Sequence, residues 1–178
     1  MTAISLPVGL QGYLRQRDLP QVQDWRPTHC GDSLMRIASN GTWFHQDRPI
    51  ARLELVRLFS TILRKDEDGF ALVTPAEKLS IEVEDAPFLA VLLNVQESGP
   101  DQRLCFTTNV GDQVTADADH SLDFQMLKGA PVPYLNVRSG LLAKAARPVY
   151  YQLAELAVTH RDRMGVWSCG TFFPFDAV

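Results

Sequence analysis

Short strand-like runs separated by turn signals are the feature that most constrains how this chain can fold. Three such runs follow one another in the middle of the chain: 70–74, 79–84 and 88–96. They are separated by residues that favour turns, Thr74-Pro75 and Asp85-Ala86-Pro87. Earlier, Asn40-Gly41 separates two shorter runs, and Asn-Gly is the strongest local signal for a β-hairpin. The pattern predicts that most of the chain after residue 69 is β-sheet.

Two longer stretches have helical spacing instead. In residues 51–63 apolar side chains recur every three or four positions, which predicts an amphipathic helix. Residues 140–158 show similar spacing and predict a second, longer helix. Pro148 lies inside this stretch and should kink or restart the helix, because proline removes a backbone hydrogen bond. A short polar helix is also predicted over residues 10–18.

The order of these elements predicts an α+β fold with two related halves of mixed α and β structure. In each half a proline precedes a helix, and a glycine, Gly69 or Gly165, opens the strand that follows. A domain duplication would explain this repeated order of elements, and chance similarity of βα units is the alternative. We expect an N-terminal half over residues 1–86, with a hairpin, a helix and strands. The C-terminal half, residues 87–178, should be β-rich, with the long C-terminal helix and a final strand.

Composition and charge are those of an ordinary soluble protein. The chain has 178 residues, 46% of them apolar and 21% charged, and can bury a core without a metal or disulfide. With 17 basic and 21 acidic side chains its net charge is −4, which argues against a general nucleic-acid coat. Its three cysteines, an odd number, fit reduced thiols. Without a basic leader or an apolar run of about 20 residues, we expect a soluble cytoplasmic protein.

Local charge is more informative than the total. Residues 48–65 carry five basic and one acidic side chain, whereas residues 66–85 carry seven acidic and one basic. One interpretation is that the two segments pack together and their charges compensate. The other is that Arg48, Arg52 and Arg57 form a face for an anionic ligand or an acidic partner surface, because the guanidinium fork binds carboxylate and phosphate well.

Candidate catalytic chemistry is sparse. His29, Cys30 and Asp32 lie close together in the sequence, but no second pair of ligands follows at the spacing of a zinc site. Cys30 activated by His29 or His45 would make a small hydrolase or thiol enzyme, which stays open as an alternative. The chain has no P-loop, dinucleotide fingerprint, nucleophile elbow or H-E-x-x-H motif. We therefore expect no metal and no cofactor, and we predict no catalytic residue.

Several short motifs occur in order along the chain. They are Trp25-x-Pro27-x-x-Cys30-Gly31, Gly41-Thr42-Trp43-Phe44, Pro49-Ile50-x-Arg52, Leu72-Val73-Thr74-Pro75-x-Glu77-Lys78, Phe106-x-Thr108-Asn109, Pro133-Tyr134-x-x-x-Arg138 and Trp167-Ser168-x-Gly170. Over about residues 24–174 the chain resembles the bacterial domain-of-unknown-function family 1285. The resemblance implies a compact α+β protein built by duplication, with a second half loosely like a pleckstrin-homology fold. It implies no established catalytic activity and suggests signalling or regulation.

These observations favour a non-enzymatic binding or regulatory module. We expect it to recognise a protein or an anionic ligand at the cleft between its two halves, and we expect no membrane partner. The candidate binding residues are Trp43, Arg52, Arg57, Glu77, Lys78, Asp85 and Arg138. For each of them a packing or salt-bridge role is the alternative. A nucleic-acid-binding protein that uses the basic helix 48–65 is a further alternative, which the net charge does not favour.

Overall fold

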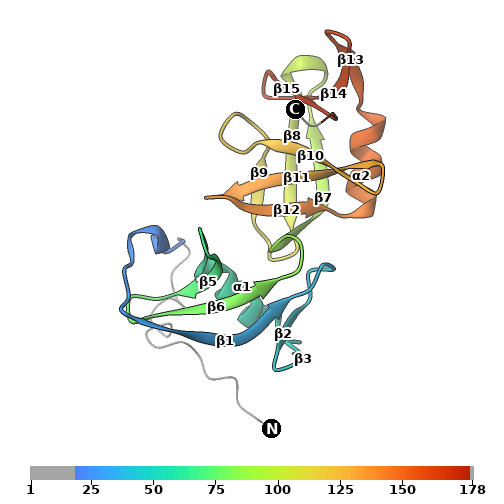
Figure 1. Cartoon of the computed structure of the whole chain (residues 1–178). Helices are drawn as coiled ribbons and strands as arrows, with labels where there is room; N and C mark the ends of the chain where they lie inside the picture. The colour runs from blue at the N-terminus through green and yellow to red at the C-terminus, as the bar shows by residue number, and fades with distance from the viewer. Residues whose placement is uncertain (1–18, 177–178) are drawn as a thin grey trace. The chain divides into compact units, whose positions relative to one another are not determined.

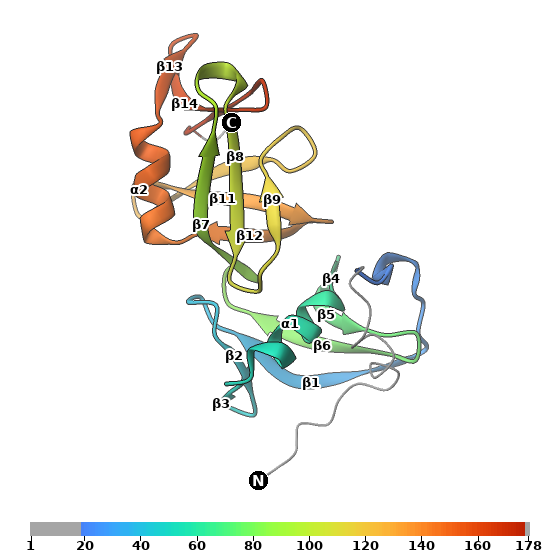
Figure 2. The same cartoon turned by 180° about the vertical axis from the view of Figure 1, so that it is seen from behind.

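The computed structural model of the protein describes residues 19–176 and consists of two compact units, Met1–Asp85 and Ala86–Val178 (Figures 1 and 2). Each unit contains a six-stranded β-sheet, and the second unit carries an additional three-stranded sheet. The helix predicted over residues 10–18 lies outside the described residues.

The sheet of the first unit joins two antiparallel, three-stranded groups through one parallel pair. Its strands are β1 (His29–Ile37), β2 (Trp43–His45), β3 (Arg48–Pro49), β4 (Leu63–Asp66), β5 (Gly69–Val73) and β6 (Glu77–Val83). They lie in the order β3-β2-β1-β6-β5-β4, with β1 and β6 parallel in the centre. The predicted Asn40-Gly41 hairpin is confirmed, since it joins β1 to the antiparallel β2 with Gly41 at φ 80°.

Helix α1 (Leu53–Thr61) lies over one face of this sheet (Figure 2). Its apolar spacing places Val56, Leu58 and Phe59 in the core. Phe59 is fully buried and stacks on Trp43 of β2, with the ring centroids 6.4 Å apart. The predicted helix was longer, but Leu63 already belongs to β4, a strand that the sequence pattern did not reveal.

The sheet of the second unit also joins two antiparallel groups through a parallel pair. Its strands are β7 (Phe88–Gln96), β8 (Arg103–Thr108), β9 (Gln113–Thr115), β10 (Leu122–Leu127), β11 (Ala130–Arg138) and β12 (Leu141–Ala145). They lie in the order β10-β11-β12-β7-β8-β9, with β12 and β7 parallel. Helix α2 (Arg147–Glu155) follows, and then the small sheet of β13 (Val158–His160), β14 (Arg163–Ser168) and β15 (Thr171–Pro174).

Ser168 fastens the small sheet to the large one within the second unit. The side chain is fully buried, and its hydroxyl donates a hydrogen bond to the Ala116 carbonyl at 2.6 Å. The same oxygen accepts one from the Leu104 N–H at 3.0 Å. Because a buried hydroxyl needs such partners, Ser168 fixes the position of β14 beside β8.

The predicted α+β fold with a long C-terminal helix is wrong. The protein is mostly β-sheet, and its described residues contain two α-helices of nine residues each. Most of the predicted helix 140–158 forms other structure: buried Leu141 and Ala143 repeat every second residue, as in a strand, and belong to β12. Pro148 lies in the first turn of α2, where proline is well tolerated. No helix of the described residues is long and apolar enough to cross a membrane.

The two halves repeat one strand order, but the predicted correspondence between their helices is wrong. The prediction matched α1 with α2. In the chain, however, α1 comes between the third and fourth strands of its unit, whereas α2 comes after the sixth strand of the large sheet in the other unit. The final strand predicted to open at Gly165 is also two strands, because Cys169 and Gly170 form a turn with φ 49° and 73°. Cys169 is exposed at this turn.

Candidate functional site

The predicted arginine face lies on the exposed side of the first unit. Arg48 is in β3, Arg52 precedes the first turn of α1, and Arg57 lies on the side of α1 away from the core. All three side chains are exposed. Among the described residues none of the three forms an ion pair. No described carboxylate therefore holds any of these guanidinium groups in an ion pair.

Trp43 occupies a different environment from the arginines. It is 1% exposed and packs against Phe59, so its ring is part of the core of the first unit. Its indole N–H is buried without a hydrogen-bond partner among the described residues. In this position the ring supplies apolar packing and no exposed contact area.

Lys78 belongs to an ion-pair network at the other edge of the same sheet. Its ammonium lies 2.8 Å from a carboxylate oxygen of Asp66 and 3.2 Å from one of Asp68. The hydrogen bond to Asp66 raises the pKa of Lys78. The neighbouring Glu77 shapes the β5–β6 turn, since its backbone N–H donates to the Thr74 hydroxyl. The half-buried Asp85 follows β6.

Arg64 is the organising residue of this network, and the sequence analysis did not single it out. The Arg64 side chain is only 9% exposed. Its guanidinium donates to both carboxylate oxygens of Asp66, at 2.7 and 2.9 Å, and to the backbone carbonyls of Val22 and Trp25. The hydrogen bond from Arg64 is the main cause that lowers the pKa of Asp66. Arg64 thereby ties the 3₁₀ turn η2 (Val22–Asp24) to β4.

Arg138 is the one candidate that lies in the second unit. Its guanidinium is 2.6 Å from the Asp112 carboxylate and lies over the ring of Phe88, 5.0 Å from the centroid. Phe88 is fully buried. These contacts give Arg138 a structural role in the second unit, so the seven candidates do not form one cluster within either unit.

The residues of the thiol-enzyme alternative are separated along the sheet. His29 and Cys30 begin β1, whereas His45 pairs with Met35, six residues further along that strand. Within residues 19–176 no hydrogen bond joins any two of them. No group of three His, Cys, Asp or Glu side chains suited to a metal ion occurs among the described residues.

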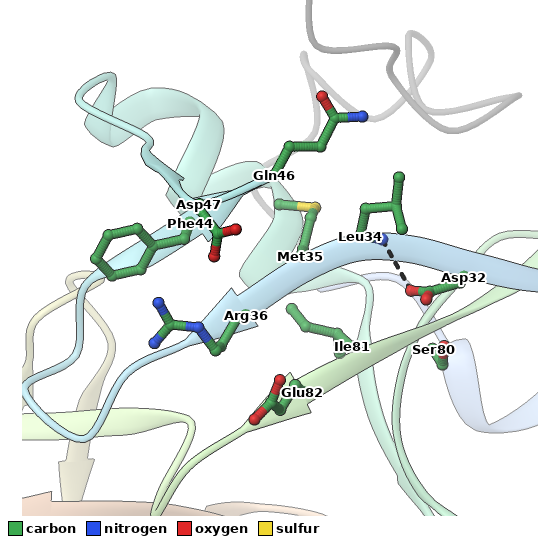
Figure 3. A pocket seen from close by; sticks show the side chains of 10 residues that line it. All are labelled: Asp32, Leu34, Met35, Arg36, Phe44, Gln46, Asp47, Ser80, Ile81 and Glu82. Atoms are coloured by element: carbon green, nitrogen blue, oxygen red, sulfur yellow. Dashed lines mark hydrogen bonds between the residues drawn. The ribbon is translucent and has the colours of Figure 1, made fainter.

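A hollow of about 630 Å³ opens beside β1, β2 and β6 of the first unit (Figure 3). It is lined by Asp32, Leu34, Met35, Arg36, Phe44, Gln46, Asp47, Ser80, Ile81 and Glu82. A second hollow surrounds the Arg64 network, and a third lies along β7, β8 and β9 of the second unit. The first hollow combines an exposed apolar side chain, Leu34, with exposed charged side chains.

A bulge in β1 shapes this hollow. Asp32 pairs with Ser80 and Met35 with the next residue of β6, so two residues of β1 are left without a partner there. The Asp32 carboxylate accepts a hydrogen bond from the Leu34 N–H at 2.8 Å (Figure 3). Leu34 has φ 54°, which is uncommon for leucine, and is 53% exposed. The bulge therefore holds an apolar side chain at the wall of the hollow.

The charges around the hollow do not balance. Arg36 is ion-paired with Glu84 and lies over the Phe44 ring, 4.4 Å from the centroid. Hydrogen bonds from the Ser39 N–H and from Arg36 lower the pKa of Glu84. The three carboxylates of Asp32, Asp47 and Glu82 form no ion pair with any described residue. The hollow carries an excess of negative charge.

Comparison with known proteins gives the family. A family model described as "Domain of unknown function (DUF1285), N-terminal domain" matches residues 20–86, and the corresponding C-terminal model matches residues 87–175. A search of curated protein sequences found no match.

Two solved structures of this family resemble the chain. A DUF1285 family protein from Silicibacter pomeroyi DSS-3 is 44% identical, with 93% of each chain covered and a TM-score of 0.86. Another, from Shewanella baltica OS155, is 28% identical, covers 68% of this chain and 91% of its own, and has a TM-score of 0.54. The resemblance read from the sequence is confirmed: the chain belongs to the DUF1285 family and has its two-domain architecture.

Proposed function

We propose that this protein is a non-enzymatic binding module with a regulatory or signalling role in the cytoplasm. Its first unit recognises an acidic protein surface or a small anionic ligand through Arg48, Arg52 and Arg57. The observation that carries this proposal is that these exposed arginines have no ion-pair partner among the described residues. Recognition at the cleft between the halves stays a prediction.

The alternative for these arginines was compensation by the acidic segment 66–85. In that segment, however, Asp66 and Asp68 pair with Arg64 and Lys78. Glu84, further along, pairs with Arg36 of β1. The acidic segment is thus partly neutralised by other cations and leaves the arginines of β3 and α1 available. A free guanidinium can form two parallel hydrogen bonds to one carboxylate or phosphate.

Affinity capture with the full chain tests the proposal. The protein and its Arg52→Ala/Arg57→Ala variant are used to enrich partners from native cytosol, and the enriched partner is then produced and titrated by calorimetry. A variant with Arg103→Ala and Arg161→Ala removes two exposed positive charges from the second unit and serves as the matched control. We expect Kd to rise at least about tenfold for the first variant and less than about twofold for the control.

Equal affinity of both variants for the partner would contradict the proposal that Arg52 and Arg57 bind it. The nucleic-acid alternative is tested in the same way with a 20-nucleotide single strand. Binding of that strand that falls steeply with added salt and depends on Arg52 and Arg57 would replace the protein partner with nucleic acid.

A further inference from the structure

The hollow beside β1, β2 and β6 has a chemistry opposite to that of the arginine face. We infer that it is a binding site for a peptide segment that carries a lysine or arginine next to an apolar side chain. The site uses other residues than the proposed arginine face, and the inference does not depend on that proposal.

Charge indicates the first half of the ligand. Asp47 and Glu82 are exposed at the hollow, and neither has a cation within ion-pair distance among the described residues. The guanidinium of Arg36 does not supply one, because it is held by Glu84 and by the Phe44 ring. An ammonium or guanidinium group that enters the hollow is attracted to carboxylates that are not already neutralised.

The apolar wall indicates the second half. Leu34 is 53% exposed and supplies the exposed apolar surface, whereas Met35 and Ile81 also line the hollow but are almost completely buried. An apolar ligand group that covers Leu34 would remove its own surface and that of Leu34 from water. This burial stabilises the complex by about 25 cal/mol per Å² of apolar surface. A polyamine offers cationic groups and thin methylene chains, whereas a peptide places a cation and a branched apolar side chain side by side. The combination of the two linings therefore favours a peptide.

Hydrogen bonds hold the backbone of the bulge in the conformation that exposes Leu34. The carboxylate of Asp32 holds the Leu34 N–H, and the Leu34 carbonyl accepts a hydrogen bond from the Gln46 N–H at 3.0 Å. The Ser33 hydroxyl donates to the Ser80 carbonyl at 2.6 Å and fastens the bulge to β6. The apolar wall is thus fixed before a ligand arrives, which lowers the ordering cost of binding.

Titration of the isotope-labelled full chain, followed by amide NMR shifts, tests the site. The probe is the blocked peptide acetyl-Ala-Leu-Lys-Leu-Lys-Ala-amide, compared with peptides in which Glu replaces Lys or Gly replaces Leu, and with spermidine. We expect saturable shifts with the first peptide, confined to residues 32–36, 44–47 and 80–82. The Glu peptide should cause none, and the Gly peptide and spermidine should bind at least about fivefold more weakly.

Two variants separate the two linings. Asp47→Asn/Glu82→Gln should raise Kd about tenfold and flatten its dependence on salt. Asparagine also suits the φ of 61° at position 47, so this change should not disturb the turn. Leu34→Asn keeps the left-handed backbone and should raise Kd about fivefold. Asp101→Asn/Glu155→Gln, which removes two exposed carboxylates from the second unit, should leave Kd unchanged.

Several outcomes would overturn the inference. They are shifts outside the hollow, equal binding of the Glu peptide, spermidine binding as tight as that of the first peptide, and no saturation at millimolar peptide. Shifts of the hollow residues that depend on protein concentration without any peptide would assign the hollow to a second copy of the chain instead. The amide spectrum of each variant, compared with that of the parent, shows that the fold is kept.

Discussion

The two large sheets of this protein have the same strand order. Counted within its own unit, each reads third, second, first, sixth, fifth, fourth strand, with the first and sixth strands parallel in the centre. What differs is where the remaining chain is placed. The first unit inserts α1 between its two strand groups, whereas the second completes its sheet and then adds α2 and a three-stranded sheet.

The difference shows how one strand order can be stabilised in two ways. In the described part of the first unit one α-helix, α1, packs on the sheet, and its Phe59 contacts Trp43. In the second unit the hydrogen bonds of the Ser168 hydroxyl join the added sheet to the large sheet. Within the added sheet, β14 and β15 pack closely on each other at Gly165. Both proposed surfaces lie in the first unit, where Asp47, Glu82 and the three arginines form no ion pair with a described residue.

The largest effect should come from removing the helix contact. We expect Phe59→Ala to destabilise the first unit by about 4 kcal/mol, because a fully buried ring is lost and a cavity remains between α1 and β2. Hydrogen exchange resolved by residue measures the loss. If amides of β7 and β8 lost protection to the same extent, the two units would not be stabilised separately.

A smaller effect should come from crowding the added sheet of the second unit. A Cβ at Gly165 would lie 2.3 Å from the Phe173 carbonyl oxygen and 2.8 Å from Cα of Pro174, so β14 and β15 would have to separate. We expect Gly165→Ala to cost about 3 kcal/mol. Gly31→Ala is the control, since its Cβ would meet side-chain atoms alone, Leu79 at 3.2 Å and His29 at 4.0 Å. Thermal melting that ranks the two variants equally would refute this role of Gly165.

The smallest of the three effects concerns the ion-pair network of the first unit. Hydrogen bonds from Arg64 and Lys78 lower the pKa of Asp66, so the unfolded chain takes up a proton at higher pH than the folded chain does. The stabilisation is complete above the ordinary aspartate pKa of about 3.9 and is lost as the pH falls below it. Asp66→Asn should cost about 2 kcal/mol at pH 7.

Denaturant unfolding of both proteins at pH 7 and pH 3 measures that difference. The difference in unfolding free energy between parent and Asp66→Asn should narrow at the lower pH, because the unfolded parent chain then takes up a proton at Asp66 more readily than the folded chain does. If the difference in unfolding free energy between the two proteins is the same at both pH values, the charge of Asp66 does not contribute to stability. Stability of the second unit should not respond to the variant, which sharpens the contrast between the two units.

Much of the strand pattern could be read from the sequence. The predicted run 88–96 coincides with β7, and Asn40-Gly41 forms the predicted turn. The prediction failed where local spacing was ambiguous: Leu141 and Ala143 fit both a helix and a strand when the pairing partner is unknown. Of the candidate site, Arg52 and Arg57 were found from local charge alone. Asp47 and Glu82 carry no local signal that marks them as neighbours.

The sequence by itself determined the family, the turn positions and the side chains available for each face. These depend on residues close together in the chain. Only the tertiary structure decided that Trp43 is core, that Arg64 holds Asp66 and the 3₁₀ turn, and that a bulge exposes Leu34. Each of these depends on contacts between distant segments, such as β1 with β6, whose Ser33 and Ser80 are 47 residues apart. Local propensity carries no information about such pairing, because the partner strand selects which face is buried.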